Sequence, residues 1–538
     1  MKLRVALSLA VIASLLAVPV GLARPTSKPV AADTVRLQVP GGPSLLDRRL
    51  RLDTVVGGLF TPIGVAFLGS NDLLVIEKNT GKVLRVINGA VTATVLDLSV
   101  NNFSERGLLG IALHPDFPTD PGVYLYWTCR SAAVQDADPF TPEERRCSDT
   151  HLTDLPDSAD VLQVPLLGNR VDRFTWDGSA LHYESNLEML LAFQNDGSPE
   201  PAGQGDSADG PHGQQPARGN HDGGVISFGR DGKLYVIVGD LGRRGALQNL
   251  ACGPTATTCP GEVTSDDQFG GPRPDDAHFS GIILRLNPDG TTPTDNPFYA
   301  TGASMGGEVG ANIQRTFAYG IRNSFGMAVD PRSGGLWQQE NGEDAFDELN
   351  RVQAGMNSGW IQIAGPASRV DQYKAIETTS LHHDDFPNLQ QFRWGPERIA
   401  DTPAEARARL FQLEGSHYSD PEFSWKFVLA PAAIGFQRGG GIGRQYDGDL
   451  FVGFSTTDTL GGPLFHFDLT GNRRAIATDD PRLADRVADN LTFHEMTESE
   501  SLLFGTDFGI VTDIETGPNG RLFVVSLDHG AIYRISRR

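Results

Sequence analysis

The stretch Tyr319–Trp360, YGIRNSFGMAVDPRSGGLWQQENGEDAFDELNRVQAGMNSGW, holds two short apolar runs bounded by turn residues. We expect strands at Gly326–Val329 and Leu336–Gln339, with the turn Asp330–Gly335 between them. Aromatic and aliphatic residues favour strands, whereas clustered Asp, Pro and Gly favour turns. This turn–strand–turn–strand unit decides the fold, because the same pattern recurs along the chain.

The recurring units share an Asp/Asn–Gly turn followed by a short apolar strand. They are Ser70–Val86, Asp120–Cys129, Gly229–Asp240, Asp330–Gly342, Tyr446–Leu469 and Gly517–Ile535. Six such units without long amphipathic helices predict an all-β fold, a six-bladed β-propeller with long inserted loops. An array of β-sandwiches is the alternative. The polar insertions are Arg130–Pro165, Asn195–Asn220, Leu250–Phe279 and Ala364–Tyr418. In the last of these, Thr402-Pro403 predicts the start of a short helix over Ala404–Leu413.

Composition excludes several classes of partner. The 538 residues carry a formal net charge of −22, so neither nucleic acid nor an anionic lipid surface is an expected partner. An anionic ligand would need a local group of Arg or Lys side chains. The 62 glycines and 34 prolines favour a fold with many tight turns over a helical one.

The N-terminus has the pattern of a secretory signal peptide. Lys2 and Arg4 precede the apolar run Val5–Leu16, and small residues follow at Gly21–Ala23. We therefore expect a signal peptide at 1–23, a linker at 24–47 and the propeller at 48–538. The expected location is secreted or periplasmic, with no stable membrane insertion after cleavage.

Four cysteines form two pairs that are close in sequence. In an exported chain this predicts the disulfides Cys129–Cys147 and Cys252–Cys259, each pinning a loop. Their spacing does not fit paired zinc knuckles.

The opening stretch also contains groups that suit a ligand. Arg322 and Asn323 at a strand end suit an oxyanion or a cofactor carbonyl. The acidic loop Glu340–Glu348 suits calcium. The alternatives are an exposed turn with a local ion pair and a solvated acidic loop.

Several further stretches, read in order, make the chain resemble a known family. These are GLLGIALHPDF (Gly107–Phe117), His221 followed by Gly223-Gly224, Phe228–Asp240, Gly281–Phe298, YGIRNSFG, DELN with GMNSGW, and Thr512–Val525. The chain resembles the glucose/sorbosone dehydrogenases, soluble sugar dehydrogenases that use pyrroloquinoline quinone (PQQ). The resemblance implies a six-bladed propeller and the cofactors PQQ and Ca²⁺. It implies a sugar substrate and an electron acceptor, which the sequence does not identify.

Sugar oxidation needs a base for the hydroxyl proton, and a neutral imidazole serves near neutral pH. His221 matches the family's base, Asp240 its orienting carboxylate and Arg322 the cation that faces the quinone oxygens. The cofactor-binding positions that the resemblance implies are Glu105, Asn323, Arg243 and Arg438. The resemblance implies two calcium ions: one bridges the cofactor through backbone carbonyls of the loop Asn341-Gly342-Glu343, and a second, structural ion uses the carboxylate of Glu348, with Asp347 beside it.

Three departures from the family pattern stand out. Glu105 replaces a glutamine, Glu343 replaces a proline, and the arginines that clamp the cofactor are missing from Thr456–Leu469. The expected function is PQQ-dependent oxidation of an aldose-type sugar hydroxyl to a lactone. The alternatives are a calcium-dependent lactonase and a non-catalytic propeller that binds carbohydrate or protein.

Overall fold

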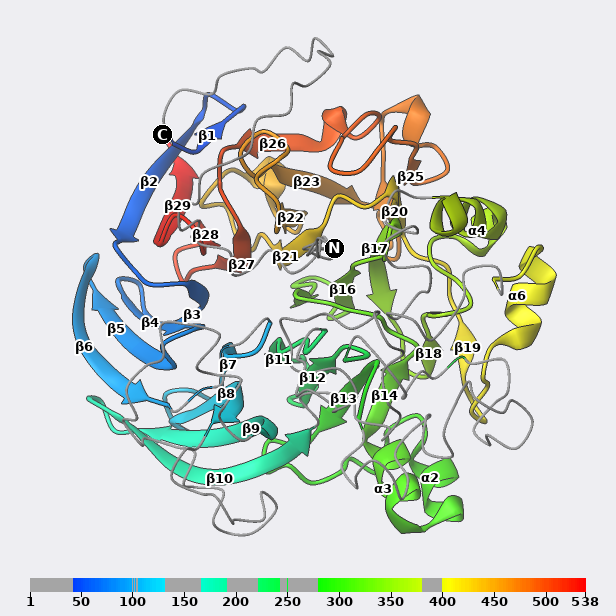
Figure 1. Cartoon of the computed structure of the whole chain (residues 1–538). Helices are drawn as coiled ribbons and strands as arrows, with labels where there is room; N and C mark the ends of the chain where they lie inside the picture. The colour runs from blue at the N-terminus through cyan, green and yellow to red at the C-terminus, as the bar shows by residue number, and fades with distance from the viewer. Residues whose placement is uncertain are drawn as a thin grey trace, which may run out of the picture.

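The computed structural model describes residues 42–98, 100, 102, 105–130, 166–190, 221–241, 249, 279–379 and 399–538. Their strands form six sheets arranged around a central axis (Figure 1). The inner strand of each sheet contacts the inner strands of its two neighbours in a closed cycle, β3–β7–β11–β15–β21–β27–β3. The predicted all-β propeller is therefore confirmed.

Three of the sheets have four strands each and form one side of the ring. One runs β3 (Pro62–Gly69), β4 (Asp72–Glu77), β5 (Lys82–Ile87), β6 (Ala90–Asp97) from the axis outward. The next runs β7 (Leu108–Leu113), β8 (Gly122–Arg130), β9 (Leu166–Trp176), β10 (Leu181–Leu190). The third runs β27 (Val511–Thr516), β28 (Leu522–Ser526), β29 (Ala531–Arg537), β2 (Leu50–Gly57).

The other three sheets are larger. One contains β11 (Ile226–Phe228), β12 (Leu234–Val238), β13 (Ile282–Leu286), β14 (Thr316–Tyr319), β18 (Met356–Asn357) and β19 (His417–Tyr418). Another contains β15 (Met327–Val329), β16 (Leu336–Glu340), β17 (Ala345–Val352), β20 (Phe423–Phe427) and β25 (Val487–Ala488). The last contains β21 (Pro431–Phe436), β22 (Leu450–Phe454), β23 (Leu464–Leu469), β26 (Leu503–Thr506), β1 (Ser44–Leu45) and β24 (Ile476–Ala477).

The ring is closed by strands from the two ends of the chain. β2 forms the outer edge of the sheet whose other three strands are the last three of the chain, pairing Leu50 with Arg537 and Gly57 with Ala531. Apolar side chains also stabilise this contact between β2 and the last strands of the chain, which we call the seam, because Val56 packs with Val525 and Ile532. Because this pairing closes the ring, the ring has no free end that could separate from the rest.

The predicted linker extends too far. It was expected to run through residue 47, yet β1 pairs antiparallel with β26, and the N–H of Gly42 donates to Asp507 Oδ2 at 2.8 Å. Asp47 accepts a hydrogen bond from the hydroxyl of Tyr446 at 2.8 Å. The packed domain therefore begins before residue 48, because backbone pairing and side-chain contacts already hold residues 42–47.

Short helices lie at the rim of the ring (Figure 1). They are α2 (Tyr299–Met305), α3 (Gly307–Arg315), α4 (Val370–Thr379) and α6 (Pro403–Arg409), with 3₁₀ turns η5 (Ala367–Arg369), η7 (Arg444–Tyr446), η8 (Pro481–Leu483) and η9 (Glu500–Leu502). The predicted helix start is confirmed: the side chain of Thr402 accepts from the N–H of Glu405 at 3.2 Å, an N-cap. This helix ends at Arg409, earlier than predicted.

The predicted signal peptide, the role of Arg243 and the two disulfides are not tested by this structure. The signal peptide, Arg243, three of the four cysteines and the side chain of Cys129 lie outside the described residues. Among the residues that the structure does describe, no helix has the length and apolar character needed to span a bilayer.

Candidate active site

The candidate catalytic residues meet at one end of the central channel. His221 precedes β11, Arg322 lies between β14 and β15, and Asp240 follows β12. Within an antiparallel sheet, the end of the second strand lies beside the start of the first. The propeller therefore gathers positions that are far apart in the sequence, as predicted from the strand pattern.

His221 and Asp240 form a direct hydrogen bond. Nδ1 of His221 lies 2.6 Å from Oδ1 of Asp240, and the two residues are 4% and 0% exposed. His221 has φ 59°, a left-handed backbone conformation that is rare outside glycine and concentrated at functional sites. A carboxylate at Nδ1 favours the tautomer in which Nδ1 carries the proton, so Nε2 is the nitrogen free to act as a base.

Asp240 is itself held on several sides. The indole Nε1–H of Trp360 donates to Oδ2 of Asp240 at 2.7 Å. The backbone N–H of Asp240 donates to the carbonyl of Arg322 at 2.8 Å. Because both carboxylate oxygens are occupied, Asp240 is fixed in the orientation that holds the imidazole.

Glu105 lies directly beneath the histidine. Its Oε2 accepts from the N–H of His221 at 2.5 Å and from Nδ2 of Asn323 at 3.4 Å. Burial raises the pKa of Glu105 to about 7, although the charges of His221 and Arg322 act in the opposite direction. Near neutral pH this carboxyl is therefore partly protonated, and it can donate a hydrogen bond as a glutamine amide would.

The guanidinium of Arg322 is buried and already paired. It lies 5.4 Å from the ring centre of Trp360, and Nη1 donates to the carbonyl of Asn341 at 3.0 Å. Nε and Nη2 both donate to Glu343, Nε at 3.1 Å. Burial opposes the charge, but the carboxylates of Glu343 and Asp240 outweigh it and raise the pKa of Arg322. The departure at Glu343 thus places an anion on the guanidinium.

The predicted acidic loop is only partly a loop. β16 ends at Glu340 and β17 begins at Ala345, so the connection is a tight hairpin. Asp347 and Glu348 are consecutive strand residues, and their side chains therefore point to opposite faces of the sheet. Gly342 and Glu343 lie in the hairpin and Asp347 and Glu348 in β17, so the positions implied for the two calcium ions lie on different elements.

The two strand carboxylates have different surroundings. Asp347 accepts from the N–H groups of Leu429 at 2.5 Å, Ala430 at 2.7 Å and Gly342 at 2.9 Å, so both its oxygens hold backbone in place. Burial raises its pKa to about 6. Glu348 is opposite Glu340 across the ladder, and burial together with the charge of Glu340 raises its pKa well above the usual value.

Two buried amide oxygens next to the site have no hydrogen-bond donor among the described residues. They are Oδ1 of Asn323 and Oδ1 of Asn341, and both residues are fully buried. A buried acceptor without a partner is costly, and a bound cation or a donor group on a ligand would satisfy it. The residues present therefore fit a ligand carrying polar groups, or a hard cation, beside Arg322.

Glu105 also lines the central cavity, together with residues of the inner strands of the ring. Its lining includes Lys78, Leu109, Gly223, Phe325, Ala432 and Asp513. Arg438 is not at the His221 end. Pro431 starts β21 beside the site, where its carbonyl accepts from Asn341, whereas Arg438 lies two residues past the other end of that strand. The five steps along this six-residue strand span roughly 17 Å at about 3.3 Å each, so Arg438 is at the opposite end of the channel.

The sequence analysis missed three contributors to the site. Trp360 was quoted only as the end of a motif, Lys78 only within a strand unit, and Asp222 was not considered. Lys78 is fully buried, its Nζ donates to the carbonyl of Arg106 at 2.5 Å, and burial lowers its pKa to about 7. Asp222 is also fully buried and its Oδ2 has no described partner. A charged residue placed directly beside His221 was the available signal for Asp222.

These features define a class of protein: a β-propeller with a buried histidine–carboxylate pair and a guanidinium at one mouth of its channel. The family model for glucose/sorbosone dehydrogenases matches residues 59–156 and 211–388, and the chain belongs to that family. The resemblance inferred from the motifs is therefore confirmed.

Individual relatives are more distant. The chain is 27% identical over 316 residues to quinoprotein glucose dehydrogenase B of Acinetobacter calcoaceticus, covering 58% of this chain and 52% of that protein. It is 32% identical over 322 residues to the aldose sugar dehydrogenase YliI of Escherichia coli, covering 60% and 61%. The match thus spans about half to three fifths of the length of these relatives.

Solved structures extend the likeness over the whole ring. The crystal structure of the soluble aldose sugar dehydrogenase from Escherichia coli in its apo form has a TM-score of 0.54 and 19% identity, covering 91% of this chain and 100% of that chain. At this identity the likeness concerns the fold alone.

Proposed function

We propose that this protein oxidises a hydroxyl of an aldose-type sugar to the lactone, with PQQ as hydride acceptor and Ca²⁺ beside it. The observation that carries the proposal is the 2.6 Å contact between Nδ1 of His221 and Asp240, which leaves Nε2 as the ring nitrogen that can act as a base. Family membership and the names of the relatives support the same reaction class. The six sheets, one per inner strand, support a propeller of six blades.

Each residue of the candidate site would have its own role in the proposed oxidation. His221 takes the hydroxyl proton at Nε2 as the substrate carbon loses hydride, and Asp240 stabilises the imidazolium that results. Arg322 supplies positive charge beside the cofactor, and Asn323 and Glu105 supply hydrogen-bonding groups. PQQ, when bound, supplies the two-electron acceptor for the hydride. A separate electron acceptor would then reoxidise it.

Calcium would lie at the hairpin after β16. The oxygen atoms that could coordinate an ion there are Oδ1 of Asn341 and the carbonyls of the hairpin, which are hard ligands that suit Ca²⁺. Asp347 is excluded from this role, because three backbone N–H groups occupy its carboxylate. These ligands agree with the loop Asn341-Gly342-Glu343 that the resemblance implied for the cofactor-bridging ion, and only Asp347, expected beside the second, structural ion, is withdrawn.

Reconstitution tests this proposal. Purified apo-protein is mixed with PQQ and Ca²⁺, and its absorption spectrum is recorded before and after an aldose is added. We expect a sugar-dependent reduction of the cofactor. Hydrolysis of a lactone in the absence of quinone would instead support a lactonase. Sugar binding without any spectral change in the holo-protein would support a binding propeller.

A further inference from the structure

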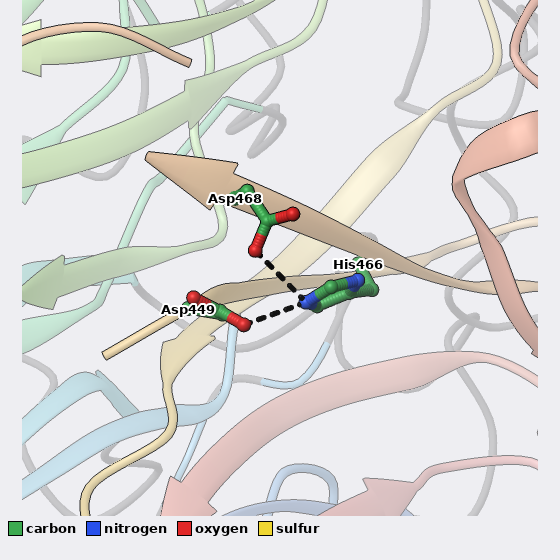
Figure 2. A group of neighbouring side chains, drawn as sticks. All are labelled: Asp449, His466 and Asp468. Atoms are coloured by element: carbon green, nitrogen blue, oxygen red, sulfur yellow. Dashed lines mark hydrogen bonds and ion pairs between the residues drawn. The ribbon is translucent and has the colours of Figure 1, made fainter. Parts of the chain in front are cut away.

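A second cluster of metal-ligating side chains lies away from the candidate active site. Figure 2 shows Asp449 and Asp468 on either side of one ring nitrogen of His466. Nε2 of His466 is 2.8 Å from Oδ2 of Asp449 and 3.8 Å from Oδ1 of Asp468. One potential ligand atom from each residue lies within 4.8 Å of the other two, the only such trio among the described residues.

The strands themselves bring the three side chains together. Asp449 immediately precedes β22, and His466 and Asp468 are two residues apart on β23, on one face of the strand. The register that pairs Leu450 with Phe467 places Asp449 opposite Asp468 when carried one residue further. Regular strands hold ligands more precisely than a loop would.

This arrangement is electrostatically unfavourable without a cation. Like charges directly opposite each other on a sheet destabilise it, and one imidazole cannot neutralise two carboxylates. The nearby guanidinium of Arg473 is already paired with Asp330 at 2.7 Å.

The imidazole is oriented before any ion arrives. The rings of Tyr446, Phe451 and Phe504 pack around His466 with centroids 5.1, 5.2 and 6.0 Å away. The side chain of Asp449 is 9% exposed, that of His466 22% and that of Asp468 59%. The cluster therefore has a buried floor and an open side, through which an ion and its remaining water ligands could enter.

We propose that Asp449, His466 and Asp468 form a binding site for a divalent transition-metal ion of the zinc type. One imidazole nitrogen and two carboxylate oxygens suit Zn²⁺, which accepts three protein ligands with water in the fourth position. Calcium is a poor match because it takes six to eight oxygen ligands. The site bridges β22 and β23 at the Leu450 end of β22, which pairs with the Phe436 end of β21, away from the His221 end of the channel.

Zinc titration of the full chain tests the site. The protein is stripped with a chelator and titrated with Zn²⁺ by calorimetry in excess Ca²⁺, which fills sites built only from oxygen. We expect His466→Gln and Asp468→Asn each to weaken one zinc-binding event by at least roughly tenfold or remove it. Zn²⁺ should also raise the melting temperature of the parent protein more than that of either variant.

A matched control separates a metal site from a simple ion pair. His182 lies 2.8 Å from Asp177 on the surface, and among the described residues this pair is not part of a three-residue cluster of metal-ligating atoms, so His182→Gln should leave zinc binding unchanged. Binding of Co²⁺ provides a second measurement of the site. The visible spectrum of bound Co²⁺ reports a nitrogen ligand, which His466→Gln would remove. If both cluster variants bind as much Zn²⁺ as the parent with equal affinity, the cluster is only an ion-paired histidine. Asp468 is exposed, so Asp468→Asn remains informative even if His466→Gln fails to fold.

Discussion

At the residue scale, the pairing of His221 with Asp240 carries the catalytic prediction. His221→Ala should lower sugar turnover by about two to four orders of magnitude, the usual span for loss of a general base. Asp240→Asn should lower turnover less, because the imidazole remains but loses its orienting anion. Stopped-flow reduction of the quinone measures the step, and cofactor binding is checked separately. Reduction at an unchanged rate in His221→Ala would remove the histidine from the mechanism.

Glu343 gives a second prediction at this scale. Its carboxylate occupies the guanidinium that the proposed function assigns to an anionic cofactor. Glu343→Gln should therefore raise the affinity for PQQ by roughly threefold to tenfold, since Arg322 no longer has to exchange one anion for another. Quenching of tryptophan fluorescence reports binding without activity.

Glu414 is exposed, and Glu414→Gln changes the net charge by the same amount as Glu343→Gln, so it serves as the control. A lower affinity in Glu343→Gln than in Glu414→Gln would mean that Glu343 positions Arg322 and does not compete with the ligand.

At the scale of elements, a substitution in β2 tests how much ring closure contributes to the stability of the fold. Val56 is 6% exposed within the seam, so Val56→Asp would bury a charge and should cost about 3 kcal/mol or more of the free energy of unfolding. Thr54 is on the same strand and exposed, which makes Thr54→Asp the matched control. Urea unfolding measures both. Equal midpoints for the two variants would show that the seam adds little to stability.

Strands were more predictable than the hairpin between them. Alternating and apolar runs predicted β15 and β16 to within a residue at each end, because such patterns report burial directly. Asp347 and Glu348 were read as loop residues, since acidic side chains rarely enter a buried strand. Backbone donors from Gly342, Leu429 and Ala430 make that possible for Asp347, and none of these partners is visible in local sequence.

The candidate site was also predictable from the sequence only in part. His221, Asp240 and Arg322 were predictable because motif order fixes them, and the ring then gathers their strand ends. Arg438 was placed wrongly, since only the strand direction reveals which end of the channel a residue occupies. The trio around His466 could not be predicted, because it depends on the register between β22 and β23.

At the scale of the whole molecule, buried carboxyls predict how stability depends on pH. The pKa of Glu105 is about 7 in the folded protein against 4.5 for an ordinary glutamate, so the folded state binds more protons between these values. Stability from this group is complete below pH 4.5 and is lost as the pH rises toward 7 and beyond. Glu340 and Asp347, whose pKa values burial raises to about 7 and about 6, act in the same direction.

Chelator-treated protein should therefore unfold more easily at pH 8 than at pH 5. Glu105→Gln should flatten the decline by about 3 kcal/mol at most. Urea unfolding in EDTA across this range provides the measurement, with Glu414→Gln as the control for charge. A stability that rises toward pH 8 in the parent protein would contradict the assignment of buried, proton-binding carboxyls.

The pairing of β2 with β29 also constrains how the chain can be made. The guanidinium Nε of Arg538 donates to the carbonyl of Leu50 at 2.8 Å, across 488 positions of sequence. A ribosome delivers Leu50 long before it delivers that partner, so the first long strand must wait, unpaired, while nearly the whole ring is synthesised. A chain that ends anywhere before Ala531 lacks β29 and leaves this edge of β2 unpaired, and an unpaired strand edge can pair with another chain and so favours aggregation.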